Sequence, residues 1–258
     1  MIRIKTKPEI EIMQRGGKIL SEVLTIIFEK LKPGVSLSEL DKLAEQEIIK
    51  RGALPSFKKV KGYFWTICGC VNDVVVHGIP NSYIIKKGDV VGIDCGVYYK
   101  GFHTDAAWTK RVQDESRIQN DEIDKFLKVG EGTLKKALEK ICPGSYIYDI
   151  SSTIADNVEA GGYFVVRSLV GHGVGRKLHE EPEIPGVVTL SRFKTPQIRE
   201  GMTLAVEVIY NMGTPDIVYG EDGWTIKTKD GKLSGLFEAT VVATNHGSLV
   251  LTKKTWVD

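Results

Sequence analysis

The sequence predicts an α+β fold in which two related halves share one core. Patterns typical of two helices followed by strand-like segments occur twice along the 258 residues. The signals that end helices and begin strands recur in the second half at nearly constant offsets. No linker rich in Pro, Ser or Gly separates the halves. We therefore expect a single domain over residues 1–258, with pseudo-symmetric halves of roughly 1–115 and 120–258.

The first predicted helix begins at a capping box. Thr6 and Glu9 have the spacing in which each side chain bonds the other's backbone N–H, and Pro8 lies between them. The segment Lys32-Pro33-Gly34 ends the helix. Apolar residues at roughly helical spacing lie between these signals: Ile12, Ile19, Val23, Ile27 and Leu31.

A second helix and a group of strands complete the first half. Ser36 and Glu39 form another capping pattern, and the helix that they open ends at Gly52. Segments rich in Val, Ile, Tyr and Thr then predict strands from Trp65 to about Val112.

The second half repeats this order. Helical patterns run from about Asp121 to Cys142 and from Tyr148 to Glu159. Strand-like segments and loops follow from Tyr163 to the end.

Two sets of matching positions indicate that the halves arose by duplication. Pro33 precedes Gly52 by 19 residues, and Pro143 precedes Gly162 by the same 19. In each half a later glycine, Gly88 or Gly201, is followed six residues on by a carboxylate: Asp94 or Glu207. The offsets are 110 residues for the helices and 113 for the strands, which one small insertion reconciles.

The composition excludes several classes of protein. With 42% hydrophobic and 26% charged residues, the chain is not typical of a disordered or collagen-like protein. A net charge of +2, from 35 basic and 33 acidic residues, gives no reason to expect nucleic acid or an anionic membrane as the main partner. Four cysteines are too few for a disulfide scaffold, and no segment resembles a signal peptide or a membrane span. We expect a cytoplasmic protein with reduced thiols.

Four carboxylates lie in strand-like segments, where Asp and Glu are normally rare. Asp94 and Asp105 flank a probable turn at residues 99–101, and Glu207 and Glu238 belong to the second half. If the halves are related by a twofold axis, the four side chains converge, and they repel one another unless cations neutralise them. Carboxylate and imidazole ligands suit a pair of divalent ions roughly 3.5–4 Å apart. A single such carboxylate would be ordinary on an edge strand, and salt-bridged structural networks remain an alternative for all four.

The histidines supply candidate ligands and catalytic groups. His172 lies in a glycine-rich segment, 171–175, and His179 follows seven residues later. His77 ends a strand-like run. His103 shares strand parity with Asp105, which suggests a supporting role at most. The remaining one, His246, fits a turn, and we assign it no role.

These motifs resemble those of the type I methionine aminopeptidases, over essentially the whole chain. The matching segments are 71–80, Gly92-Ile93-Asp94, Gly101-Phe102-His103-Thr104-Asp105, 171–182 and 224–230. The resemblance implies the pita-bread fold, a pseudo-twofold arrangement of helix–helix–strand halves around a curved antiparallel sheet.

The resemblance also implies a metal centre with five protein ligands. Asp94 would bind one of two divalent ions (Co, Mn, Fe or Zn), His172 and Glu207 would bind toward the other, and Asp105 and Glu238 would bridge both. Ions of this kind lower the pKa of a bound water, so that it becomes a nucleophile near neutral pH.

Catalytic and substrate-binding residues follow from the same resemblance. Glu207 would transfer the proton of the attacking water, His179 would stabilise the developing oxyanion, and His77 would contact the neighbouring amide. The methionine pocket would be lined by Tyr63, Cys68, His77, Leu178, His179 and Trp224, of which Cys68 and Trp224 suit a thioether side chain.

Two residues depart from the family pattern. Val208 follows Glu207 where the family usually has Pro, and Ala239 follows Glu238 where it usually has His. Because side chains alternate across a strand, we expect both to point away from the metal ligands. We therefore expect these two residues to alter the packing behind the site and not to remove a metal ligand.

The expected function is removal of the initiator methionine from nascent proteins with small second residues, at the ribosome, by a monomer. Two alternatives remain. Prolidases and aminopeptidase P enzymes share such ligands but normally carry a further N-terminal domain. Non-catalytic binding proteins of this fold tend to lose metal ligands, whereas all five positions are filled here.

Overall fold

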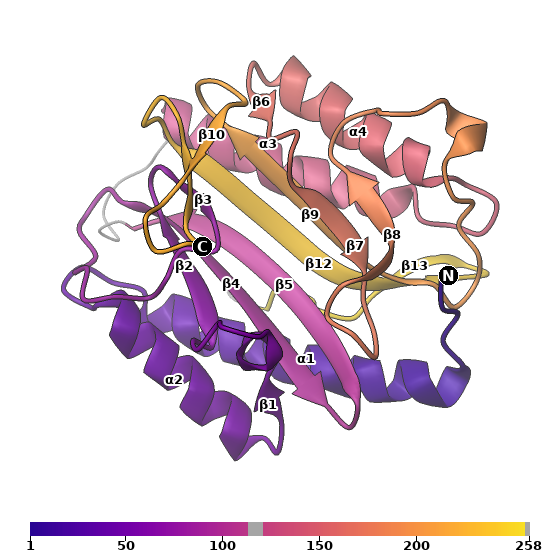
Figure 1. Ribbon diagram of the computed structural model, residues 1–258, viewed down its shortest axis with the longest axis horizontal. Coiled ribbons are helices and arrows are strands. Elements are labelled where there is room, and N and C mark those ends of the chain that lie inside the picture. The colour runs from indigo at the N-terminus through magenta and orange to yellow at the C-terminus, as the bar shows by residue number, and fades with distance from the viewer. Residues whose placement is uncertain (113–120, 256–258) are drawn as a thin grey trace.

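A computed structural model describes residues 1–112 and 121–255, and shows an α+β architecture (Figure 1). The predicted junction of the halves, residues 115–120, lies outside the described residues. The helices are α1 (Lys7–Lys30), α2 (Leu37–Lys50), α3 (Glu122–Glu139) and α4 (Ile147–Ala160), with 3₁₀ turns η1 (Phe57–Lys59) and η2 (Arg192–Lys194). The strands are β1 (Leu54–Pro55), β2 (Ile67–Val71), β3 (Val74–Val76), β4 (Val90–Tyr99), β5 (Phe102–Arg111), β6 (Phe164–Val165), β7 (Val170–Gly173), β8 (Glu180–Pro185), β9 (Thr203–Asn211), β10 (Ile217–Tyr219), β11 (Ile226–Thr228), β12 (Ser234–Thr244) and β13 (Gly247–Val250).

The helices begin where the sequence predicts. The capping boxes of Thr6 with Glu9 and of Ser36 with Glu39 are both present at the starts of α1 and α2. The strand prediction was less complete, because it began at Trp65 and missed the short strand β1 and the turn η1.

One antiparallel sheet runs through both halves. Its central path is β1-β4-β5-β12-β9-β7-β8, and β2, β6 and β13 pair with β4, β9 and β12 respectively. Strands β5 and β12 join the halves, with Glu238 opposite Ala107 and Ala239 opposite Ala106. A smaller sheet of β10, β11 and β3 lies apart from this path.

Equivalent hydrogen bonds confirm the duplication. Gly34 N donates to Ile85 O at 2.9 Å, and Gly144 N donates to Ile198 O at 3.0 Å. These pairs are related by the offsets of 110 and 113 residues that the sequence shows. Strands β1 and β6 likewise stand at equivalent positions, 110 residues apart, and pair with β4 and β9.

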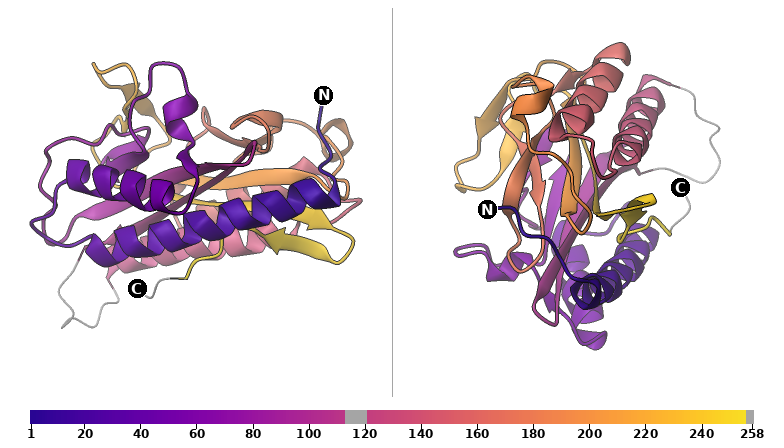
Figure 2. Two further views of the ribbon diagram at one scale, coloured as in Figure 1. Left: turned by 90° about the horizontal axis from the view of Figure 1, so that it is seen from below. Right: turned by 90° about the vertical axis from the view of Figure 1, so that its right-hand side faces the viewer.

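Both helix pairs cover the same face of the sheet (Figures 1 and 2). One apolar cluster joins α1 and α2 to odd-numbered residues of β4 and to Ala106 of β5. Another joins α3 and α4 to Val206, Val208 and Ala239. Ala106 and Ala239 are paired across the junction, so the two clusters lie on one face. The prediction that residues 208 and 239 point away from the carboxylates is therefore confirmed.

The structure also bears on membrane-spanning helices and on the state of the cysteines. In the part of the chain that the structure describes, no helix is long and apolar enough to cross a membrane. Cys68, Cys70 and Cys95 are buried free thiols, and Cys142 is an exposed one.

Candidate metal centre

The sheet register places the predicted ligands in two adjacent rows on the face that the helices leave free. In the first row Asp94 pairs with Ala107, Ala107 with Glu238, and Glu238 with Glu207. Paired residues project to the same face, so three carboxylates stand side by side across four strands.

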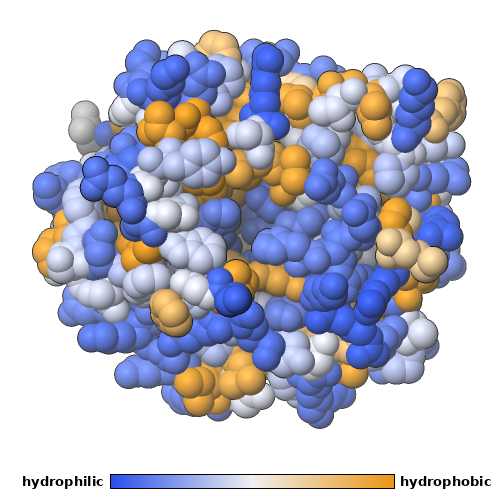
Figure 3. Space-filling model, viewed as in Figure 1, coloured by the Kyte–Doolittle hydropathy of each residue, from blue (hydrophilic) through white to orange (hydrophobic). Residues whose placement is uncertain are grey.

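The second row lies two residues along the strands and supplies the remaining ligands. Asp105 stands two residues before Ala107 on β5, and His172 of β7 pairs with Ala205, two residues before Glu207 on β9. A spacing of two keeps a side chain on the same face of a strand. All five predicted ligands are thus brought together, and the surface is hollowed near the middle of this face (Figure 3).

The distances fit a shared cation site. Ligand atoms of Asp105, His172 and Glu238 all lie within 4.8 Å of one another. Glu207 Oε1 lies 3.5 Å from His172 Nε2, and Asp94 is close enough to hydrogen-bond Asp105.

Three buried oxygens of this group lack a partner. Within the described residues, no protein group hydrogen-bonds to Asp94 Oδ1, Asp105 Oδ1 or Glu238 Oε1. An unpartnered buried carboxylate oxygen is costly, and the cost disappears when a cation binds it. The observation argues against a salt-bridged structural network, and the oxygen-rich donor set with one imidazole fits divalent metal ions.

The pKa values of the four carboxyl groups also indicate a cation site. Burial raises the pKa of Asp94 to about 7, although hydrogen bonds with Cys68 and Asp105 oppose the shift. Burial, followed by the charges of the other carboxylates, holds the pKa values of Asp105, Glu207 and Glu238 well above their usual range. Without a cation the cluster therefore retains protons near neutral pH.

His172 is oriented as a ligand. Its Nδ1–H donates to the carbonyl oxygen of Gly173 at 2.9 Å, which leaves Nε2 as the nitrogen that faces Glu207. Such a bond fixes the tautomer of a metal-binding imidazole. Burial lowers the pKa of His172 to about 4, so the ring is neutral at physiological pH.

Of the other two predicted histidines, His179 borders this group and His77 lies near His179. The His179 ring lies 4.5 Å from the His172 ring, edge to face. His77 follows β3 with a positive φ of 55°, an uncommon conformation for a residue other than glycine. Partial removal from water lowers the pKa of His77, and the charge of His179 adds to the effect. Both residues are exposed on the surface.

Four of the six predicted pocket residues belong to one apolar cluster, which does not include His77 or His179. Tyr63, Cys68 and Leu178 are buried in it, and Trp224 packs against it. The Tyr63 hydroxyl lies 3.2 Å from Cys68 Sγ, and the rings of Tyr63 and Trp224 are 5.1 Å apart. Cys68 is also the register partner of Asp94, so the cluster continues the first row of ligands.

Some residues that shape the site were not found from the sequence. Ala107 stands between Asp94 and Glu238 in the register and presents only a methyl group there. Thr240 exchanges hydrogen bonds with the backbone of Asp105 at 2.8 and 2.9 Å. His103 is buried and bonds Ser56 through Nδ1, and its supporting role at the site stays a prediction. A small side chain in a strand carries no sequence signal of its own, so only the register reveals these positions.

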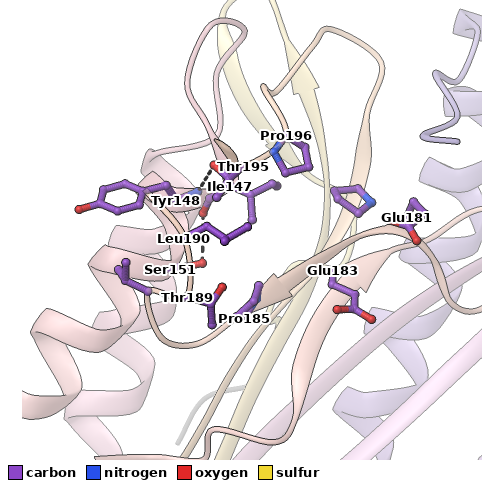
Figure 4. Close-up of a pocket in the computed structure, with 12 residues that line it drawn as sticks. Ile147, Tyr148, Ser151, Glu181, Glu183, Pro185, Thr189, Leu190, Thr195 and Pro196 are labelled. Atoms are coloured by element: carbon purple, nitrogen blue, oxygen red, sulfur yellow. Dashed lines mark hydrogen bonds between the residues drawn. The ribbon is translucent and has the colours of Figure 1, made fainter. Parts of the chain in front are cut away.

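A separate groove of about 330 Å³ lies between α4 and the segment that follows β8 (Figure 4). Ile147, Tyr148 and Leu190 line it on one side and Glu181 and Glu183 on the other. None of the predicted site residues lies in it.

The sequence of this chain is similar to those of known metallopeptidases. The model of metallopeptidase family M24 matches residues 11–245. The chain belongs to this family. The methionine aminopeptidase of Clostridium perfringens is 44% identical over 252 residues, 98% of this chain and 99% of its own length. Methionine aminopeptidase 1 of Bacillus subtilis is 41% identical and is covered completely.

Similar solved structures confirm the fold. The methionine aminopeptidase of Thermotoga maritima superimposes with a TM-score of 0.93 at 38% identity, covering 98% of this chain and 100% of that one. The prolidase from Pyrococcus furiosus shares the fold at 24% identity and a TM-score of 0.76, but this chain covers only 65% of it. The predicted resemblance and the pita-bread architecture are both confirmed.

Proposed function

We propose that this chain removes the N-terminal methionine from polypeptides whose second residue is small. The observation that carries the proposal is the pair of ligand rows, with three unpartnered carboxylate oxygens, directly beside a buried apolar cluster that contains Cys68 and Trp224. The curated relatives that are 35–44% identical over nearly the whole chain are methionine aminopeptidases.

The five ligands would hold two divalent ions. Asp94 would belong to one ion, His172 and Glu207 to the other, and Asp105 and Glu238 to both. When bound, such ions polarise a carbonyl group and make water a better nucleophile near neutral pH.

The chain's own side chains would carry the protons and orient the substrate. Glu207 would accept a proton from the attacking water and return it to the leaving amide nitrogen. His179, which borders His172 and reaches solvent, would donate a hydrogen bond to the oxyanion of the scissile carbonyl. His77 would hold the amide of the second residue.

The cluster of Tyr63, Cys68, Leu178 and Trp224 would bind the methionine side chain. Its walls are aromatic, aliphatic and sulfur-containing, and such surfaces make favourable contacts with a thioether. Tyr63 and Cys68 are the most enclosed members of this cluster, with 4% and 3% exposure.

We further propose that residues 1–258 act as one monomeric catalytic domain in the cytoplasm, on nascent chains at the ribosome. The sheet that crosses from β5 to β12 supports a single unit, because the ligands come from both halves. Three buried free thiols suit a reducing compartment.

Release of free methionine from the peptide Met-Ala-Ser tests the function, with Leu-Ala-Ser and an Ala-Pro peptide as matched alternatives. The protein is stripped of metal, reloaded with Mn or Co, and its bound ions are counted. We expect methionine from the first peptide and at least tenfold less product from the others. Preference for the Ala-Pro peptide would place the chain with the prolidases and aminopeptidase P enzymes. No product from any of the three peptides, with two ions bound, would favour a binding protein.

A further inference from the structure

The start of the segment that carries Leu178 and His179 is tied to the sheet by a backbone hydrogen bond, in which His103 N donates to Gly175 O at 2.7 Å. Residues 175–179 form a series of bends between β7 and β8 and belong to neither strand. Gly175 N donates to Lys177 O at 3.0 Å, and Lys177 N donates to the side-chain oxygen Oε1 of Glu180 at 3.1 Å. The shape of the bend therefore depends on where the Glu180 carboxylate is held.

A lysine from the other end of the chain holds this carboxylate. Lys5 Nζ lies 2.7 Å from Glu180 Oε2, and the side chains are only 4% and 5% exposed. The same ammonium donates to Arg3 O at 3.3 Å. Each oxygen of Glu180 thus has a separate partner: Lys177 N for one and Lys5 for the other.

The path of the N-terminal segment is built around this contact. Figures 1 and 2 show the segment leaving the start of α1 and running beside the strands of the second half. Lys5 N donates to Gly201 O at 2.9 Å. At Gly175 a Cβ atom would lie 2.4 Å from Lys5 Cε, so glycine leaves the space through which the lysine reaches Glu180.

We propose that Lys5 is a positioning residue for His179, acting through Glu180. Burying two charges costs more desolvation than a surface pair, so a buried pair is poorly explained by stability alone. Here the pair fixes the residue that follows His179, while Leu178 on the other side is buried in the apolar cluster. His179 is an exposed residue, but it is held between two buried anchors. The inference rests on the oxyanion role proposed for His179.

A second ion pair joins the same bend to the first turn of α1 and offers a control. Arg176 Nη2 lies 2.8 Å from Glu9 Oε1, but the Arg176 side chain is 54% exposed. Exposed ion pairs of this kind do little to fix the position of the backbone. Arg176→Met removes a charge from the bend without touching the Glu180 carboxylate.

The experiment compares Lys5→Met, Arg176→Met, His179→Ala and the double variant Lys5→Met/His179→Ala as Mn-loaded proteins. We expect Lys5→Met to lower kcat on Met-Ala-Ser by roughly 10- to 100-fold, because small displacements of a catalytic group are costly. KM, bound ions per chain and the affinity for free methionine stay within about twofold of wild type. Arg176→Met leaves kcat unchanged, and Lys5→Met causes no further loss when His179 is absent.

Binding supplies a readout that does not depend on turnover. A methionine-derived phosphonate, whose oxygen stands in for the oxyanion, should lose affinity in Lys5→Met to the same degree that kcat falls. If Lys5→Met does not fold, the uncharged pair Lys5→Met/Glu180→Gln carries the same expectations, since its amide oxygen still accepts from Lys177 N.

Equal losses from Lys5→Met with and without His179, or a wild-type kcat in Lys5→Met, would overturn the positioning role. A wild-type kcat in His179→Ala would instead overturn the role that the proposed function gives to His179. The two failures are therefore distinguishable.

Discussion

Removal of metal should make the stability of this protein fall as the pH rises from 6.5 to 8. The pKa values of Asp105, Glu207 and Glu238 are held well above their usual range by burial and mutual repulsion, so the metal-free folded protein keeps protons that the unfolded chain has lost. A raised folded-state pKa contributes stability at low pH, and that contribution is lost as the pH rises. The four histidines whose pKa values are lowered act in the opposite direction, because the unfolded imidazole loses the rest of its charge between pH 6.5 and 8. Each adds only about 0.4 kcal/mol over this range, so the raised carboxylates outweigh them.

The size of the expected fall follows from the slope of the free energy of unfolding against pH. Each proton retained only by the folded protein lowers the free energy of unfolding by roughly 1.4 kcal/mol for every pH unit. One such proton over 1.5 pH units amounts to roughly 2 kcal/mol. Bound metal requires ionised ligands, so the stabilisation that it provides should increase over the same range.

Urea unfolding of EDTA-treated protein at pH 6.5, 7.2 and 8.0, with and without Mn, measures both effects. Glu238→Gln is the matched control, because it removes one of the buried carboxylates and should give a shallower slope. The reasoning is refuted if the free energy of unfolding of the metal-free protein stays constant or rises over this range. It is also refuted if Mn increases that free energy equally at pH 6.5 and 8.0.

Four substitutions test individual parts of the site. His179→Ala should lower kcat on Met-Ala-Ser about 100-fold or more with little change in KM, as measured by steady-state kinetics; an unchanged kcat would contradict the oxyanion role. Trp224→Ala should mainly raise KM for the same peptide, since it removes one wall of the apolar cluster, and a selective fall in kcat would contradict this. Ala107→Leu should lower the number of bound ions measured by elemental analysis, because its side chain fills the gap between Asp94 and Glu238. Ala239→His should leave two ions bound but lower the free energy of unfolding in urea by about 1–3 kcal/mol, because it overfills the apolar face against α3 and α4.

Much of this arrangement could be predicted from local patterns. The capping residues set the starts of α1 and α2, and a carboxylate at a fixed distance after Gly88 and Gly201 indicated the duplicated strands. Strict alternation along a strand was enough to place Val208 and Ala239 on the helix-covered face.

Other features depend on pairing between distant strands and could not be predicted. The importance of Ala107 follows only from the register that sets it between Asp94 and Glu238. The contact of Lys5 with Glu180 joins residues 175 positions apart, and neither residue has a neighbouring motif that indicates a partner. Local propensity carries no information about such contacts, because tertiary packing creates them.

The central claim is that the converging carboxylates form the metal centre on which methionine release depends. The most direct measurement is methionine release from Met-Ala-Ser by wild type and Glu238→Gln, with the ions bound to each protein counted in the same samples. We predict two ions and turnover for wild type, and fewer than two ions with at least 100-fold slower release for the variant. Two ions and undiminished release in Glu238→Gln would contradict the account.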